Sequence, residues 1–165
     1  MNLDVRPLQG IEQARLCAGW MSSTDPWITL GRDFDECLSA ITAPDAEVWI
    51  AHEADGPAAF ILLVLQGPFA GYVRTLCVSP QCRGRGVGSE LLAWAEARIY
   101  RDFPNVFLCV SSFNVRARSL YERLGYETIG ELKDFVVRGH SEWLMRKPGV
   151  PWREFKPAGT AAPRE

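Results

Sequence analysis

Three glycines at alternate positions, Gly84, Gly86 and Gly88, stand between a β-rich run and a helical pattern. Glycine tolerates positive φ and lets a ligand approach the backbone closely. The start of a helix offers free N–H groups and a partial positive charge, so this junction predicts an anion site, most often one for phosphate. Arg83 and Arg85 add formal positive charge at the same place. The alternative is an ordinary glycine turn whose arginines face water, because short glycine motifs often match by accident.

The spacing of these glycines excludes two other phosphate-binding loops. A dinucleotide-binding fingerprint has two residues between its last two glycines, whereas a single residue separates Gly86 from Gly88. That fingerprint also requires an acidic residue after the next strand, and here the strand 106–110 is followed by Ser-Ser-Phe-Asn. A P-loop requires Gly-Lys before Ser or Thr, which the chain does not contain. The sequence therefore argues against a nucleotide-binding module.

A second group of residues with chemical potential lies on the predicted helix 115–124. Ala117, Leu120, Tyr121 and Leu124 share one helix face by their spacing. By spacing alone, Tyr121 is a core residue whose hydroxyl points at a polar gap. Asn114 directly precedes the helix, and asparagine is a good N-cap residue.

Length and composition bound the class of protein. The chain has 165 residues, of which 47% are hydrophobic and 23% are charged, as in a single globular domain. A net charge of −2 without a polybasic run predicts no nucleic-acid partner. The N-terminal sequence lacks the apolar core of a signal peptide, and no apolar run approaches the roughly 18 residues of a membrane span. We therefore expect a cytoplasmic protein with no membrane partner.

The cysteines predict neither disulfides nor a metal site. They number five, they are scattered, and none forms a C-x-x-C pair. Cys77 and Cys109 lie in apolar strand patterns and are expected to be small buried residues in a reducing compartment. His52 and His140 are distant in sequence from the cysteines, so we expect no metal.

The elements that must position these residues follow from hydrophobic periodicity. The pattern predicts strands at 3–7, 48–51, 58–65, 72–78, 106–111, 126–132 and 136–145, and helices at 11–20, 33–41, 87–101 and 115–124. Three consecutive strands form an antiparallel meander, and the β-α-β unit that follows requires a right-handed crossover.

The expected fold class is α/β (α+β), with a mixed, mostly antiparallel sheet of six to seven strands and helices on both faces. One domain is expected to span residues 1–147. A Pro/Gly-rich tail, 148–165, is expected to be poorly ordered, although Trp152 and Phe155 offer side chains that could dock it.

Two motifs together resemble the GNAT superfamily of N-acetyltransferases. Gln-Cys-Arg-Gly-Arg-Gly at 81–86 fits Gln/Arg-x-x-Gly-x-Gly/Ala, and Val-Ser-Pro at 78–80 fits the Val-x-Pro before it. Residues 114–126 fit Asn-x-x-Ala-x-x-Leu-Tyr-x-x-x-Gly-Phe/Tyr. The resemblance extends from Leu3 to Lys147. It implies a GNAT-like fold with the fourth and fifth strands splayed apart, acetyl-CoA as co-substrate, and direct transfer of acetyl to an amine.

The resemblance also implies site residues. Backbone N–H groups from Gly84 to Ser89 would meet the pyrophosphate of coenzyme A. The edge of the fourth strand would pair with the pantetheine amides and stabilise the oxyanion, and Asn114 would bridge to pantetheine. Tyr121 would protonate the leaving thiolate as general acid, which makes it the catalytic residue. The cofactor-binding set comprises Leu76, Val78, Arg83, Gly84, Arg85, Gly86, Val87, Gly88, Ser89, Asn114 and Tyr121.

The general base does not follow from the motifs. Similar protein N-terminal acetyltransferases often carry a glutamate five residues before the asparagine, where this chain has Cys109. A buried thiol is a poor base at neutral pH, so either water relays the proton or another side chain accepts it. His140 is of the residue type that titrates near neutral pH. The candidates are Asp25, Asp134, His140 and Glu142.

The acceptor site is expected between the segments 21–27 and 133–140, by the geometry of the family. Asp25 and Trp27 offer a carboxylate and an aromatic face to a cationic amine, and His140 completes this expected substrate set. The alternative is an Asp-Pro turn with Trp27 in the core. The sequence does not identify the acceptor, which can be an aminoglycoside, a polyamine, an amino acid, a protein lysine or an N-terminus. It also leaves open whether the protein forms a homodimer.

The favoured function is transfer of acetyl to the primary amine of a small molecule. The runner-up is a protein N-terminal or lysine acetyltransferase of the same fold. A non-catalytic acetyl-CoA-binding sensor is the alternative of another class, and the presence of Tyr121 argues against it, since binding alone needs no acid.

Overall fold

The structure, a computed structural model, describes residues 3–158. Its elements in chain order are β1 (Asp4–Pro7), α1 (Gly10–Ser22), α2 (Phe34–Ile41), β2 (Ala46–Glu53), β3 (Gly56–Val64), β4 (Tyr72–Val78), a short 3₁₀ turn (Pro80–Cys82), α3 (Val87–Ile99), β5 (Asn105–Ser111), α4 (Val115–Arg123), β6 (Glu127–Lys133) and β7 (Ser141–Pro148).

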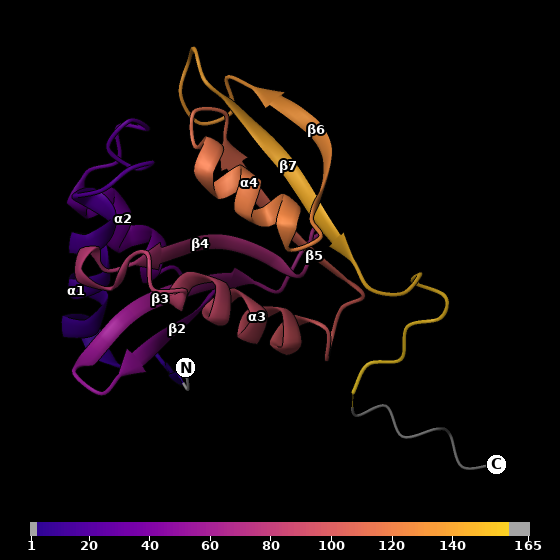
Figure 1. The fold of residues 1–165 in the computed structure, drawn as a ribbon, viewed down its shortest axis with the longest axis horizontal. Helices are drawn as coiled ribbons and strands as arrows, with labels where there is room; N and C mark the ends of the chain where they lie inside the picture. Colours follow the sequence, from indigo (N-terminus) through magenta and orange to yellow (C-terminus); the bar gives the residue numbers. More distant parts are fainter. Residues whose placement is uncertain (1–2, 159–165) are drawn as a thin grey trace.

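The strands form one sheet of seven in the order β1-β2-β3-β4-β5-β7-β6. Each neighbouring pair is antiparallel except β4 and β5, which are parallel. Helices α1 and α2 pack on one face of the sheet and α3 on the other, and α4 lies beside β5 (Figure 1). The predicted fold class is thereby confirmed.

β3 forms the centre of the sheet because both of its faces are covered. Its residues from Ala58 to Leu63 are fully buried. Ile61 and Leu63 point into the core under α3, whereas Phe60 and Leu62 point into the core under α1 and α2. A continuous apolar run, rather than an alternating one, is what a strand buried on both faces requires.

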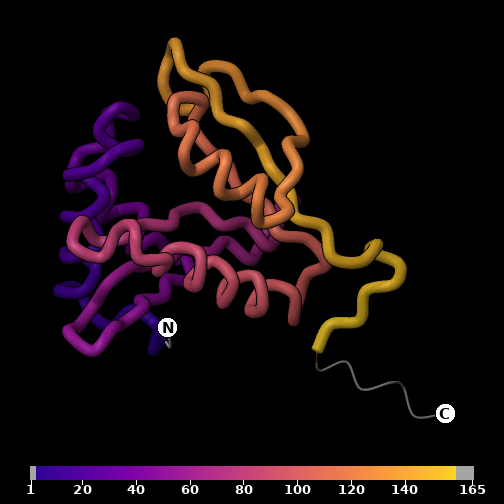
Figure 2. The backbone as a smooth tube through the Cα atoms, viewed as in Figure 1, coloured from indigo at the N-terminus to yellow at the C-terminus, as the bar shows by residue number. Residues whose placement is uncertain are grey.

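β4 and β5 pair only at their beginnings. The parallel register joins Tyr72 to Phe107 and Val73 to Leu108, and it goes no further although both strands continue. The register between β3 and β4 skips Arg74, which makes this residue the extra one of a β-bulge. A bulge bends its strand and increases the local twist. Beyond the bulge the two strands diverge, as the tube in Figure 2 makes visible, and this is the predicted splay.

The last strand differs from its predicted range. It begins at Ser141 rather than at residue 136, and the residues before it form a turn. The Asp134 carboxylate closes this turn by accepting from the Gly139 N–H at 2.6 Å. Local turn chemistry has therefore overridden the apolar pair Val136–Val137, which the hydrophobic pattern assigns to a strand.

The tail crosses the C-terminal end of α3 as far as it is described. β7 runs to Pro148, one residue past the predicted domain boundary. The Gly149 N–H donates to the Pro104 carbonyl at 2.8 Å, and the Ala158 N–H donates to the Arg101 carbonyl at 2.7 Å. The remainder of the predicted disordered tail, 159–165, lies outside the described residues. None of the helices between residues 3 and 158 is both long and apolar enough to cross a bilayer.

Candidate active site

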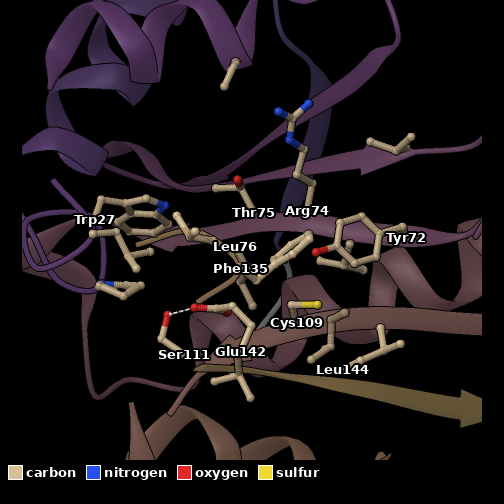
Figure 3. Close-up of a pocket in the computed structure, with 18 of the residues that line it drawn as sticks. Trp27, Tyr72, Arg74, Thr75, Leu76, Cys109, Ser111, Phe135, Glu142 and Leu144 are labelled. Atoms are coloured by element: carbon tan, nitrogen blue, oxygen red, sulfur yellow. Dashed lines mark hydrogen bonds between the residues drawn. The ribbon is translucent and has the colours of Figure 1, made fainter. Parts of the chain in front are cut away.

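The diverging strands open a pocket with a volume of about 840 Å³. β4 and β5 form its walls, α2 and the segment after α1 close one side, and β7 with the β6–β7 turn closes the other. Figure 3 looks into this pocket, with Trp27 at one end and Tyr72 at the other. Because the pocket follows the split in the sheet, backbone groups of a sheet edge border it, as the resemblance implies.

β4 contributes both a wall of the pocket and the seat of α3. Leu76 lines the pocket. Val78 does not line it and packs toward the start of α3 instead, where a Cβ added to Gly88 would lie 3.2 Å from the Val78 Cγ2. Glycine at position 88 thus allows the helix to approach the strand closely.

The loop before α3 has the open backbone that an anion site needs. Gly84 has φ +74° and Gly86 has φ +86°, conformations that favour glycine, and no atom lies within 4 Å of a Cβ added at either position. Gly86 is the N-cap of α3, and Val87, the first helical residue, is buried against the core. The N–H groups of the first helical turn therefore border an uncrowded surface, which fits the pyrophosphate of coenzyme A.

The two arginines of the loop are already engaged by the protein. The Arg83 Nε donates to the Val78 carbonyl at 3.2 Å. The Arg85 guanidinium forms an ion pair with Glu53 at 3.1 Å. The loop therefore offers an anion mainly its backbone, and less free guanidinium charge than the sequence alone indicates.

Tyr121 and Asn114 both line the pocket from α4. Asn114 is the N-cap of this helix, and its side-chain oxygen accepts from the Ala117 N–H at 3.3 Å, so the capping role holds. Tyr121 is half-buried and meets Tyr126 edge to face, with ring centroids 5.7 Å apart. Burial raises the pKa of Tyr121 to about 12, so the phenol keeps its proton at neutral pH.

Cys109 corrects the expectation of a buried core thiol. It is half-buried and lines the pocket from β5, where its side chain hydrogen-bonds with the Tyr72 hydroxyl. The apolar residues around Cys109 predict a buried strand and give no sign of the split between β4 and β5. The split exposes the Cys109 side chain, which a continuous sheet would cover. Burial raises the pKa of the thiol, so Cys109 remains a poor base. Cys77, by contrast, is buried as expected.

Glu142 stands out among the four candidates for the general base. It is 6% exposed, it lines the pocket from β7, and its Oε1 accepts from the Ser111 hydroxyl at 2.6 Å (Figure 3). The two residues face each other across the β5–β7 register. Burial raises the pKa of Glu142, whereas the Ser111 hydrogen bond and the charge of His140 oppose that rise.

The predicted acceptor residues differ in whether they line the pocket. Trp27 lines the pocket and also packs against the core under α1 and α2. Asp25 is exposed and closes a local turn by accepting from the Thr29 hydroxyl at 2.7 Å. His140 packs on Phe113, with ring centroids 5.0 Å apart. Of the predicted acceptor residues, only Trp27 lines the pocket.

Tyr72, Ser111 and the bulged Arg74 are among the pocket residues that the sequence analysis did not single out. Strand alternation is a signal for one of them, because it places Cys109 and Ser111 on the same face of β5. No corresponding signal marks the bulge. Between residues 3 and 158 no three His, Cys, Asp or Glu side chains gather as metal ligands.

Comparisons with known proteins identify the family of this chain. The chain matches the model of the acetyltransferase (GNAT) domain over residues 44–128, which reach from β2 into β6. It is 34% identical to blasticidin-S acetyltransferase from Streptomyces morookaense over 76 residues, which are 46% of this chain and 56% of that protein. It is 30% identical to mycothiol acetyltransferase from Beutenbergia cavernae over 141 residues, which are 74% of this chain and 48% of that protein.

Solved structures share the fold at low sequence identity. Spermidine N-acetyltransferase from Vibrio cholerae, solved with CoA and spermine, superposes with a TM-score of 0.69 at 18% identity, over 89% of this chain and 95% of that one. The chain spans between 22% and 56% of the length of the curated relatives it matches. Since the family model covers more than half of the chain, including the glycine loop and both split strands, the chain belongs to the acetyltransferase (GNAT) domain family.

Proposed function

We propose that this protein transfers an acetyl group from acetyl-CoA to the primary amine of a small molecule. One observation carries the proposal: residues implied on the donor side and residues implied on the acceptor side line the same pocket. Leu76, Asn114 and Tyr121 belong to the first group, and Trp27 and Glu142 to the second. A shared pocket allows direct transfer, because the two reactants can be held in contact.

The chain's own groups have separate tasks in this proposal. The backbone of the loop at Gly84 and Gly86 binds the pyrophosphate, and the free edge of β4 orients the pantetheine arm. Acetyl-CoA supplies an activated acetyl thioester. Tyr121, whose raised pKa keeps it neutral, donates a proton to the departing sulfur.

Two features of the site, and the name of one relative, favour a small acceptor over a protein. Cys109 occupies the position of the glutamate that similar N-terminal acetyltransferases carry, and its raised pKa disqualifies it as a base. The pocket volume of about 840 Å³ also falls within the range of small-molecule clefts. A relative of the chain is named for acetylation of blasticidin S, a small molecule. Tyr121 in the pocket argues for catalysis over a sensor.

The direct test is a turnover screen with acetyl-CoA, in which free thiol release is measured against a panel of amines. The panel should hold simple aromatic and aliphatic amines, a polyamine, an aminoglycoside, amino acids and peptides with free N-termini. We expect release above the amine-free background with at least one small amine. Thiol release only with peptides would overturn the small-molecule acceptor and support protein acetylation instead. Tight acetyl-CoA binding without release for any amine would favour a sensor.

A further inference from the structure

Within the described part of the chain, Glu142 is a buried carboxylate that is not ion-paired, although the charge of His140 acts on it. Among the described residues it forms no ion pair, and its hydrogen bond comes from the neutral hydroxyl of Ser111. Glu96, the other buried glutamate, is neutralised by Lys147 at 2.6 Å. Burying a carboxylate costs free energy unless a cation and hydrogen bonds compensate. Glu142 therefore lacks the compensation that the fold gives to Glu96.

The pocket opens onto this carboxylate, so a ligand can provide the missing cation. Figure 3 shows the Glu142 carboxylate among side chains that line the pocket, with the dashed hydrogen bond from Ser111. The charge of Glu142 acts on the Cys109 thiol, which also lines the pocket. Phe135 and Leu144 also line this part of the pocket. Apolar walls exclude water and strengthen the attraction between a carboxylate and an ammonium group.

We propose that Glu142, aligned by Ser111, binds the ammonium group of the acceptor and accepts its proton, and that the acceptor is a singly charged amine with an apolar body. This inference rests on the proposed acetyltransferase function. It names a base on β7, whereas the similar N-terminal acetyltransferases carry theirs on the fifth strand.

The charges in the pocket support the class of acceptor. Its charged lining residues, within the described part of the chain, are two arginines and two glutamates: Arg32, Arg74, Glu36 and Glu142. Glu36 already accepts from the Asp33 N–H in a capping box. A second ammonium of a polyamine would therefore meet two guanidinium groups and no free acidic cluster. An apolar body instead meets Trp27, Phe135 and Leu144.

The proton balance of the step is simple. An N–H bond of the ammonium breaks, an O–H bond forms on Glu142, and the nitrogen regains its lone pair. The nitrogen then bonds to the acetyl carbon while the carbon–sulfur bond breaks and its electron pair leaves with sulfur. Sulfur takes a proton from Tyr121, which is restored by the second proton that nitrogen loses. The products are the amide, the free thiol and the proton that Glu142 returns to solvent.

The first test measures binding without turnover. We would titrate the protein, saturated with CoA, with 2-phenylethylamine and with its neutral isostere 2-phenylethanol. We expect the wild type to bind the amine at least 10-fold more tightly than the alcohol, and Glu142→Gln to lose this preference, because the loss removes a charge-assisted hydrogen bond. A preference that persists in Glu142→Gln would overturn the inference.

The second test measures turnover in the same variants. Glu142→Gln should lower kcat/KM by about 10²- to 10⁴-fold, the usual contribution of a general base, and leave the affinity for acetyl-CoA unchanged. Glu131→Gln is the matched control, because Glu131 accepts from the Ser141 hydroxyl at 2.7 Å in an exposed pair outside the pocket. Spermidine used more efficiently than 2-phenylethylamine would overturn the acceptor class.

The thermal stability of Glu142→Gln provides a further test of the uncompensated charge. Burial raises the pKa of Glu142 in the fold, so the ionised carboxylate opposes folding at pH values above its unfolded pKa. Glutamine removes that charge and still accepts from Ser111. Glu142→Gln should therefore unfold at the same temperature as the parent or a higher one, and a strong decrease would overturn the inference of an uncompensated charge.

The pH profile identifies the proton acceptor. The titratable groups that act on Glu142 are His140 before β7, Cys109 on β5 and Tyr72 on β4. Ser111 is a positioning residue, and Ser111→Ala should move the acid limb of kcat/KM to higher pH by about one unit, since a hydrogen bond to the ionised form is lost. An acid limb that vanishes in His140→Gln and persists in Glu142→Gln would assign the base to His140.

The outcomes separate this inference from the proposed function. An amine preference that depends on Glu142, in a protein that releases no thiol from acetyl-CoA with any amine, would overturn the acetyltransferase proposal and support the amine site. Thiol release that is equal in the wild type and Glu142→Gln would support the acetyltransferase proposal and overturn the base.

Discussion

Tyr121 is the residue whose chemistry depends most on its surroundings. Burial raises its pKa from the ordinary value of 10.0 to about 12, so it can donate a proton and keeps that proton at neutral pH. Tyr121→Phe should retain acetyl-CoA affinity within a few-fold and lower kcat by roughly 10- to 1,000-fold, as expected for the loss of a general acid. Calorimetry with acetyl-CoA would measure the affinity, and steady-state and rapid-quench kinetics would measure kcat and the chemical step.

Tyr126 provides the control for that substitution. It is the ring partner of Tyr121, it is 3% exposed, and it does not line the pocket. Tyr126→Phe removes a hydroxyl from the same aromatic pair and should change stability more than kcat. An equal loss of kcat in both variants would mean that Tyr121 acts through packing.

Cys109 tests whether the residue that replaces a glutamate takes part in the reaction. Its thiol faces the pocket, but the raised pKa keeps it neutral at pH 7 to 8. Cys109→Ala should cost about 1 kcal/mol of stability and leave kcat within about three-fold of the parent. Urea unfolding and thiol release would measure both quantities.

The matched variant for Cys109 is Cys77→Ala, which removes a buried thiol from outside the pocket. A hundred-fold loss of kcat in Cys109→Ala alone, with folding intact, would show that the thiol enters the chemistry. An acetyl-cysteine intermediate would then replace direct transfer.

The junction between the glycine loop and α3 is the element that should hold the donor. Gly86 caps the helix at φ +86° and faces open space. A glutamate there would place a side chain and a negative charge in the anion site, so Gly86→Glu should abolish acetyl-CoA binding in calorimetry. Gly10→Glu is the control, because Gly10 begins α1 at φ +69° and is equally uncrowded. Unchanged affinity in a folded Gly86→Glu protein would contradict the anion site.

The elements differ in how far the sequence predicts them. The pattern predicts β4 to the residue, because residues that favour strands are concentrated there and glycine precedes them. It misplaces the start of β7, because the Asp134–Gly139 turn competes with a short apolar pair. It gives no sign of the bulge at Arg74, which follows from the register with β3 rather than from local preference.

The site shows the same division. The glycine loop and Tyr121 belong to motifs of consecutive residues, so the sequence alone identifies them. The pair Ser111–Glu142 joins two residues that are 31 positions apart and depends on the register of their strands, so the sequence only places Glu142 among several candidates. The pocket-facing position of Cys109 likewise depends on the split in the sheet, which its apolar neighbours conceal.

The strands β1–β4 and the strands β5–β7 are joined only where β4 pairs with the beginning of β5, and Gly71 allows the close approach of the backbone at this joint. A Cβ at this position would lie 2.5 Å from the Asn105 carbonyl oxygen, and its φ is +91°. Gly71→Ala should therefore destabilise the whole molecule by about 2 to 4 kcal/mol, through strain and displacement of β5. Urea denaturation would measure this loss.

Gly67 is the control for the joint, because it lies in the same loop at φ +83° with open space around it. Gly67→Ala should cost only the conformational part, about 1 kcal/mol. Equal losses at the two positions would mean that the contact with Asn105 contributes nothing.

The split also places free sheet edges where other proteins cannot easily use them. Unpaired strand edges are templates for aggregation, and outer edges are usually short, charged, bulged or interrupted by proline. β1 has four residues and ends at Pro7, while β6 carries a bulge at Ile129 and three charged residues. The unpaired edges of β4 and β5, beyond Val73 and Leu108, instead border the pocket inside one molecule. The fold can thus keep backbone N–H and C=O groups available to a ligand without exposing them to strand pairing and aggregation with other proteins.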